Sequence, residues 1–118
     1  MSAAAQAKPV DLEHLARYTG GDAALNAEVL ALFADQSVEL LAKLQSVIEA
    51  RDPKEWKAIT HSLKGAARGI GAFGYGDAAA RAEPALPAED NTNAMAALQA
   101  LQQEADRVQR FIAAYLNR

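Results

Sequence analysis

The chain contains no cysteine, and this absence rules out several kinds of site at once. Disulfide bonds, thiolate nucleophiles and cysteine-ligated zinc cannot occur without it. Aromatic residues are also scarce, at 6% of 118 residues with a single Trp. Alanine is abundant instead, with 29 residues, and it forms helices well while adding little bulk to a core. This composition favours a small, closely packed helical domain over a sheet protein.

The chain also lacks an excess of positive charge and a long apolar run. Its net charge is −3 and its pI about 5.3, whereas non-specific nucleic-acid binding needs a basic surface. No stretch of about 18 apolar residues is present that would predict a transmembrane helix. The start of the chain lacks the charged and Leu-rich regions of a signal peptide. We therefore expect a cytoplasmic protein that binds neither nucleic acid nor membrane. We also expect a monomer.

Apolar residues recur at helical spacings along most of the sequence. Together with the capping and breaking residues between them, they predict helices at 11–18, 22–50, 53–70, 75–81 and 93–116. Residues 1–10 are expected to form a loose tail, and residues 11–118 one helical domain. Four main helices with short connections favour an all-α fold, namely an up-down antiparallel four-helix bundle with a short additional N-terminal helix.

A few residues set the expected helix boundaries and core positions. Asp11 and Asp52 are placed to cap the helices that follow them, and Pro53 suits a first helical position. Residues expected to loosen or stop helices are Gly69, Gly71, Gly74, Gly76, Pro84 and Pro87. Residues expected to face the core are Leu25, Val29, Leu32, Phe33, Leu40, Leu41, Leu44, Val47 and Ile48 in the second helix, and Met95, Leu98, Leu101, Ala105, Val108, Ile112 and Tyr115 in the last.

His61 lies on the third predicted helix, on the side away from the core. The apolar residues of that helix gather on one face: Trp56, Ile59, Leu63, Ala66, Ala67 and Ile70. At about 100° per residue, His61 falls about 180° from the middle of this face and should point to solvent. A histidine of the core would lie within the apolar stripe instead.

The residues around His61 indicate that its imidazole at times carries a negatively charged group. Gly65 follows one turn later, where it costs roughly 1 kcal/mol relative to Ala but leaves clearance for such a group or for a partner. Four cations project from the same broad face: Lys54, Lys57, Lys64 and Arg68. Lys64 or Arg68 could neutralise phosphoryl oxygens, and neutral imidazole is a nucleophile toward an activated phosphorus. The alternative interpretation is a solvated, lysine-rich helix face with an ordinary surface histidine.

The twelve residues that begin at His61 add a sequence signature to this geometry. They read His-Ser-Leu-Lys-Gly-Ala-Ala-Arg-Gly-Ile-Gly-Ala. This string closely resembles the signature of the histidine-containing phosphotransfer (HPt) domains of bacterial and fungal phosphorelays, which is His-x-Leu-Lys-Gly, two small residues, two variable residues and Leu/Ile-Gly-Ala/Leu. The predicted helix pattern matches the family over the rest of the chain. The resemblance implies a four-helix bundle with a phosphorylated histidine exposed on one helix.

The resemblance carries over to single residues. His61 matches the phosphoacceptor, which is usually modified on Nε2, and Lys64 matches the lysine that helps to balance the phosphoryl charge. Gly65 matches the small position beneath the imidazole, and Gly71 the glycine that ends the helix. The implied partners are receiver domains of response regulators and a sensor or hybrid histidine kinase.

The match weakens after Gly71. The family often carries a Glu on the next helix, and Glu83 falls at that position. Pro84 follows it directly and disfavours helical geometry at the residue before it. We therefore expect a short or distorted fourth helix and no role for Glu83 in orienting His61.

Other kinds of site find little support in the sequence. No Walker-type loop or Gly-x-Ser-x-Gly motif is present, so we expect a phosphocarrier without a cofactor or a nucleotide site, and not an enzyme. Asp11 and His14 have the spacing of a metal-ligand pair on a helix, but a di-metal bundle needs a second pair, so no metal site is expected.

Two alternatives to a phosphocarrier remain open at this point. One is a helical module that binds receiver domains without any chemistry. The other is a dimerising, phosphoaccepting fragment of a histidine kinase. Such fragments usually place an acidic residue directly after the histidine, where this chain has Ser62.

Overall fold

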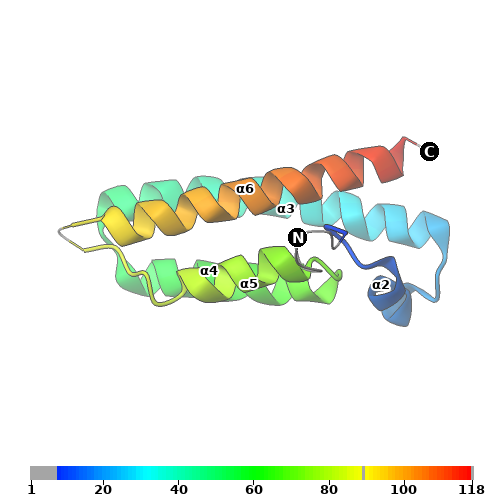
Figure 1. The fold of residues 1–118 in the computed structure, drawn as a ribbon, viewed down its shortest axis with the longest axis horizontal. Helices are drawn as coiled ribbons and strands as arrows, with labels where there is room; N and C mark the ends of the chain where they lie inside the picture. Colours follow the sequence, from blue (N-terminus) through cyan, green and yellow to red (C-terminus); the bar gives the residue numbers. More distant parts are fainter. Residues whose placement is uncertain (1–7, 89, 118) are drawn as a thin grey trace, which may run out of the picture.

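A computed structural model describes residues 8–88 and 90–117, most of them in helices (Figure 1). No strand occurs in these ranges, which confirms the predicted all-α class. Within the same ranges, no helix is both long and apolar enough to cross a membrane. The helices are α2 (Leu12–Thr19), α3 (Ala23–Ala50), α4 (Pro53–Gly69), α5 (Phe73–Ala82) and α6 (Thr92–Leu116).

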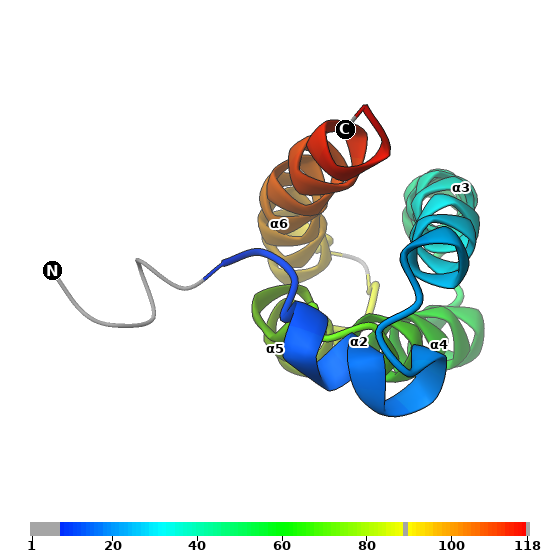
Figure 2. The same cartoon turned by 90° about the vertical axis from the view of Figure 1, so that its right-hand side faces the viewer.

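Helices α3 to α6 form an up-down bundle in which each helix runs antiparallel to the next (Figure 1). Seen end-on, the four helices lie at the corners of a quadrilateral, and α6 closes the ring against α3 (Figure 2). At 1.5 Å per residue α3 is about 42 Å long, whereas α5 spans only about 15 Å. Helix α2 lies across one end of the bundle. The predicted four-helix bundle with a short N-terminal helix is therefore confirmed.

Side-chain caps fix the starts of the first three of these helices. The carboxylates of Asp11, Asp22 and Asp52 accept backbone N–H groups of α2, α3 and α4 at distances between 2.9 and 3.2 Å. Each cap satisfies N–H groups that have no partner inside the helix. The predicted caps Asp11 and Asp52 are confirmed, and Pro53 occupies the first helical position as predicted.

The core lies between the four bundle helices and is built around Trp56 of α4 and Tyr75 of α5, both nearly inaccessible to solvent. Three residues predicted to face the core are exposed instead: Leu25 (39%), Leu32 (65%) and Met95 (60%). A bundle helix presents one stripe to the core, and these side chains lie at the edges of the stripes of α3 and α6.

The glycines after residue 68 do not all loosen the backbone as predicted. Gly69 is the last residue of α4, whereas Gly74 and Gly76 lie inside α5. Only Gly71 adopts a left-handed conformation, with φ +86°, and it separates the two helices. Its N–H donates to Arg68 O at 3.1 Å, which closes the end of α4 in the manner of a Schellman motif.

The segment before α2 is packed against the turn between α4 and α5. Val10 is fully buried, and the N–H of Asp11 donates to Gly71 O at 2.9 Å. Of the predicted tail at 1–10, residues 1–7 lie outside the described part of the chain. The prediction is wrong for Val10, because its apolar side chain fills a space in the core.

A buried hydrogen bond links two helices of the core that are far apart in the sequence. Ser37 Oγ of α3 and Tyr75 Oη of α5 lie 2.6 Å apart. The Tyr75 ring also meets Phe33 edge-on, with ring centroids 5.8 Å apart. Burial raises the pKa of Tyr75 to about 12, and the hydrogen bond to Ser37 opposes that rise.

Because Tyr75 is buried, we expect the free energy of unfolding to fall at alkaline pH. The folded-state pKa of Tyr75 lies above its ordinary value of 10.0, so its contribution is fully present below pH 10 and is lost as the pH rises through about 12. Two units correspond to about 2.7 kcal/mol. Urea unfolding from pH 7 to pH 12 should show this loss in the wild type and not in Tyr75→Phe. An equal alkaline loss in both proteins would contradict the assignment to Tyr75.

Candidate functional site

His61 lies near the middle of α4 and faces solvent. Its side chain is 71% exposed, whereas Trp56, Ile59 and Leu63 on the opposite side of the helix are buried. The orientation predicted from the helical period is therefore confirmed. The imidazole is open to approach by another molecule.

A carboxylate lies beside this imidazole and is paired with a lysine. Glu83 Oε1 lies 3.6 Å from His61 Nδ1 and 2.5 Å from Lys64 Nζ. The first distance is longer than a hydrogen bond and makes an electrostatic contact, whereas the second marks a tight ion pair. Glu83 Oε1 is shielded from solvent in this arrangement. The structure thus places one carboxylate, that of Glu83, next to both His61 and Lys64.

The prediction that Pro84 keeps Glu83 out of helical geometry is wrong. Glu83 has φ −51° and ψ −47°, and its N–H makes the last backbone hydrogen bond of α5 at 3.1 Å. Pro84 ends the helix because it has no N–H, but it leaves the residue before it helical. The indole N–H of the buried Trp56 donates to Ala82 O at 2.8 Å and ties the end of α5 to α4. This tie places Glu83 beside the imidazole.

The charges around Glu83 hold it in the ionised form. The hydrogen bond and charge of Lys64 lower the pKa of Glu83 below its ordinary value, partial burial opposes this, and His61 adds a smaller lowering. An ionised Glu83 keeps a negative charge close to Nδ1 of His61.

Replacement of Glu83 by Gln is expected to remove an acid-sensitive part of the stability. Because the folded-state pKa lies below the ordinary 4.5, the carboxylate stabilises the fold above pH 4.5 and this contribution is lost as the pH falls through the lower value. At pH 7 the free energy of unfolding in urea should be about 1 kcal/mol higher for the wild type than for the variant. Below pH 4.5 the difference should shrink. Glu39→Gln, at an exposed site on α3, is the control, and a Glu83→Gln difference that stays constant into acid would contradict the ion pair's role.

The side of α4 next to His61 carries little side-chain bulk. Gly65 and Gly69 follow His61 by four and eight residues, and a Cβ atom built at either meets nothing within 4 Å beyond its chain neighbours and the nearby backbone of α4. The clearance predicted for Gly65 beneath the imidazole is therefore present. Gly69 extends the same open strip toward the end of the helix.

Arg68, which the sequence placed near a phosphoryl group, points toward α5 instead. Its Nη2 lies 3.5 Å from Asp77 Oδ1, and its side chain crosses Gly76. A Cβ atom at Gly76 would lie 2.7 Å from Arg68 Cγ, so this glycine makes the crossing possible. The structure therefore groups His61, Lys64 and Glu83 and gives Arg68 a separate partner.

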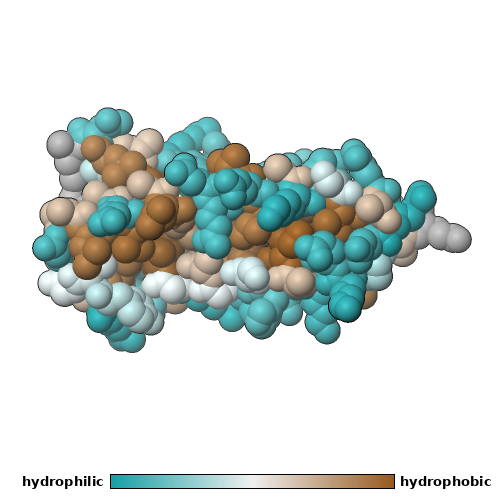
Figure 3. Space-filling model, turned by 180° about the vertical axis from the view of Figure 1, so that it is seen from behind, coloured by the Kyte–Doolittle hydropathy of each residue, from teal (hydrophilic) through white to brown (hydrophobic). Residues whose placement is uncertain are grey.

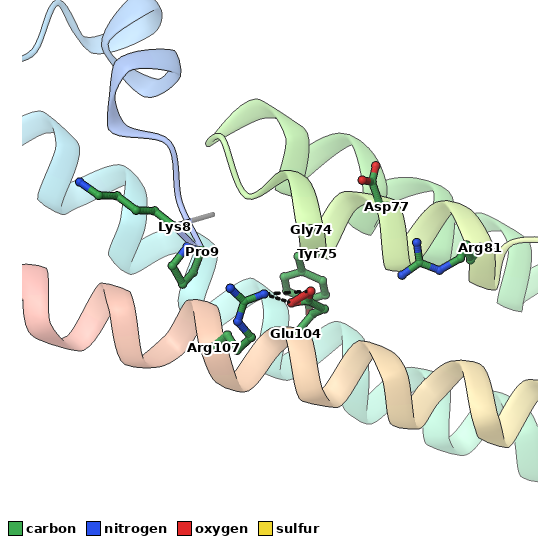
Figure 4. A pocket seen from close by; sticks show the side chains of 8 residues that line it. All are labelled: Lys8, Pro9, Gly74, Tyr75, Asp77, Arg81, Glu104 and Arg107. Atoms are coloured by element: carbon green, nitrogen blue, oxygen red, sulfur yellow. Dashed lines mark hydrogen bonds and ion pairs between the residues drawn. The ribbon is translucent and has the colours of Figure 1, made fainter. Parts of the chain in front are cut away.

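Another hollow lies between α5, α6 and the segment before α2 (Figure 4). It has a volume of about 210 Å³, and charged side chains of both signs point toward it. Arg107 is paired there with Glu104 at 2.9 Å. The hollow contains no histidine and lies away from the exposed face of α4.

The second histidine has structural neighbours. The His14 ring packs edge-on against Phe73 at 5.0 Å and Tyr18 at 5.7 Å. Asp11, its suggested companion in a metal pair, uses its carboxylate to cap α2. Across residues 8–88 and 90–117, no three His, Asp or Glu side chains come together in a way that could hold a metal ion.

Comparison with known proteins places this geometry in a family. A sequence model of the Hpt domain matches residues 28–111, a range that contains His61, Lys64 and Glu83. No curated protein and no solved structure gave a significant match. The matched range covers most of α3 and all of α4 and α5, and it ends within α6. The chain therefore belongs to the Hpt domain family, whose members are helical phosphocarrier modules of phosphorelay signalling rather than enzymes.

Proposed function

We propose that this protein accepts a phosphoryl group on His61 and passes it to another signalling protein. The donor is the phospho-aspartate of a receiver domain or a histidine kinase, and the acceptor is the aspartate of a response-regulator receiver. The observation that carries the proposal is the exposed imidazole of His61 beside the Lys64–Glu83 ion pair. Membership of the Hpt family supports the class of function.

The position of Glu83 favours Nε2 as the reacting atom. A carboxylate that faces Nδ1 favours the tautomer with its proton on Nδ1, which leaves a lone pair on Nε2. Nε2 attacks the phosphorus of the aspartyl phosphate, the P–N bond forms and the P–O bond to the aspartate breaks. The aspartate leaves as a carboxylate, and the positive charge left on the ring lies next to Glu83. Transfer to the next receiver reverses these steps on a different aspartate.

Lys64 supplies a charge for the phosphoryl group. In the unmodified protein its ammonium is held by Glu83, and its flexible stem can carry it toward oxygens bound at Nε2. Gly65 leaves the space that those oxygens need. Arg68 could contribute only after it leaves Asp77, so we give it a secondary role.

The protein then acts only as a carrier that presents the phosphoryl group on His61 to other proteins. Transfer of this kind depends mainly on positioning and charge stabilisation. We assign any Mg²⁺ that the reaction needs to the receiver domain. We also propose that the carrier is a monomer. We place it in the cytoplasm, because the phosphoryl groups of kinases and receivers come from cytoplasmic ATP.

The proposal is tested by mixing the protein with receiver domains of its source organism, each phosphorylated beforehand with labelled acetyl phosphate. Label should appear on the protein, disappear in acid and survive in alkali, as a phosphoryl–nitrogen bond requires, and peptide mapping should place it on His61. Receivers that bind without transferring label would favour an interaction module without chemistry. A stable dimer in light scattering would favour the kinase fragment.

A further inference from the structure

Two ion pairs connect α4 to α5 on the side of the histidine, and each joins a cation of α4 to a carboxylate of α5. Lys64, one turn after His61, is held by Glu83. Arg68 follows one turn later, and its Nη2 lies 3.5 Å from Asp77 Oδ1. The second pair therefore repeats the arrangement of the first at a greater distance from the imidazole.

Arg68 lies on the same side of α4 as His61. It follows the histidine by seven residues, which is about 10.5 Å along the helix axis. At about 100° per residue, the two side chains leave the helix in directions only about 20° apart. A long side chain in a helix leans toward the start of that helix, which for Arg68 is the direction of His61. The guanidinium can therefore reach a phosphoryl group on the imidazole once it leaves Asp77.

The helix surface between His61 and Arg68 leaves this path open. The residues that lie between them, about one turn from each, are Lys64 and Gly65. Lys64 is drawn aside by its ion pair with Glu83 on α5. Gly65 has no side chain, and a Cβ atom built there meets nothing within 4 Å beyond its chain neighbours and the nearby backbone of α4. A guanidinium that swings toward the imidazole thus crosses open surface.

Gly76 determines where Arg68 rests in the unmodified protein. This glycine is buried inside α5, and a Cβ atom added to it would lie 2.7 Å from Arg68 Cγ. Alanine is a better helix former than glycine. The missing side chain at position 76 therefore makes room for the arginine stem, which carries the guanidinium to Asp77.

The ion pair between Arg68 and Asp77 is exposed to water. Its two side chains keep 46% and 61% of their surface accessible. Figure 3 shows the side of the bundle on which α3 and α4 lie, with hydrophilic side chains along both long edges. Exposed ion pairs contribute little to stability. An arginine held in this way can change its partner without loss of the fold.

We propose that Asp77 holds Arg68 away from His61 in the unmodified protein and releases it to the phosphoryl group when His61 is phosphorylated. The inference rests on the proposed function. A phosphoryl group attracts the guanidinium more strongly than Asp77 does, because it carries more negative charge and three acceptor oxygens. The lost ion pair is a cost of the phosphorylated form only, so Asp77 favours onward transfer. Asp77 is a positioning residue, since it acts through Arg68.

The effect of Asp77 is measured with a receiver that loads the wild type, as the ratio of phosphorylated carrier to phosphorylated receiver at equilibrium. Asp77→Asn should raise this ratio about threefold, because an exposed ion pair no longer competes for Arg68. Arg68→Gln should lower it. Added to Arg68→Gln, the Asp77→Asn change should have almost no further effect, a dependence that a merely structural ion pair does not produce.

Asp106→Asn is the matched control for the change in charge. Asp106 is 57% exposed and pairs with Arg110 on α6 at 2.9 Å, so its replacement also removes one carboxylate from an exposed ion pair. This variant should give the same equilibrium ratio as the wild type. If Asp106→Asn raised the ratio as much as Asp77→Asn, the effect would come from net charge and the inference would be overturned.

The movement of Arg68 is followed by NMR after chemical phosphorylation with phosphoramidate, a small donor that needs no receiver. The Nε–H signal of Arg68 should shift when His61 is phosphorylated. Asp77→Asn should move this signal in the unmodified protein and leave it unchanged in the phosphorylated one. A signal that does not respond to phosphorylation would overturn the inference.

The outcomes separate the two proposals. If no receiver labels the wild type, the proposed function fails, and the Arg68 signal alone decides whether the arginine changes partner. If label passes normally but Asp77→Asn leaves the equilibrium ratio unchanged, the proposed function stands and the role of Asp77 is overturned. It is also overturned if the Asp77→Asn effect keeps its full size beside Arg68→Gln, because Asp77 would then act on the phosphoryl group directly.

Discussion

Replacement of His61 by Gln is expected to abolish phosphoryl incorporation from every receiver that labels the wild type. The amide nitrogen of Gln shares its lone pair with the carbonyl and cannot attack phosphorus, so no slower transfer remains at this position. The fold should be unaffected, because the side chain is 71% exposed and such substitutions usually change stability by less than about 0.5 kcal/mol. The measurement is the label retained after incubation, with thermal unfolding followed on the same samples.

His14 provides the matched control as the other histidine of the chain. Its ring packs against Phe73 at the start of α5, whereas Glu83 lies at the other end of that helix, so His14→Gln leaves the His61 site intact. This variant should take up label. Label retained by His61→Gln and lost from His14→Gln would move the phosphoacceptor to His14.

Replacement of Gly71 by Ala is expected to cause the largest loss of stability considered for this protein. A non-glycine residue at φ +86° is strained by about 1–2 kcal/mol. The added Cβ would also lie 2.5 Å from Asp11 O, so the segment that carries buried Val10 must move. We expect a total loss of about 3 kcal/mol and a thermal midpoint lower by roughly 10 °C. Urea and thermal unfolding measure both.

Gly20→Ala separates the two causes of that loss. Gly20 has φ +66°, but beyond its chain neighbours nothing lies within 4 Å of a Cβ built there. Its replacement should cost only the backbone strain, about 1 kcal/mol. If Gly71→Ala were no worse than Gly20→Ala, the contact between Asp11 and the α4–α5 turn would contribute nothing to stability.

The local features of the fold were predictable from the sequence because they depend on residues a few positions apart. Caps at Asp11 and Asp52 and a break before Pro53 gave helix boundaries close to those observed. The outward direction of His61 followed from the helical period alone. The closeness of Lys64 to His61 was also predictable without tertiary information, because Lys64 lies one helical turn away.

The contacts between helices were not predictable in the same way. Glu83 reaches His61 because Trp56 ties the end of α5 to α4, and this long-range bond outweighs the local preference of a residue before proline. Arg68 was expected beside the phosphoryl group, but Asp77 on the neighbouring helix draws it away. In both cases the residue that fixes the side chain's position belongs to another helix. The helical period of α4 carries no information about where that helix lies.

The helices, the outward direction of His61 and its companions within one turn follow from the order of residues alone, because hydrogen bonds and periodicity inside a helix are local. Packing between the helices places a carboxylate at this site, and it buries Val10 while it leaves Met95 exposed. It also closes an apolar hollow between α2, α3 and α4. These features depend on which helix faces cover one another, and that is settled by packing across the whole bundle.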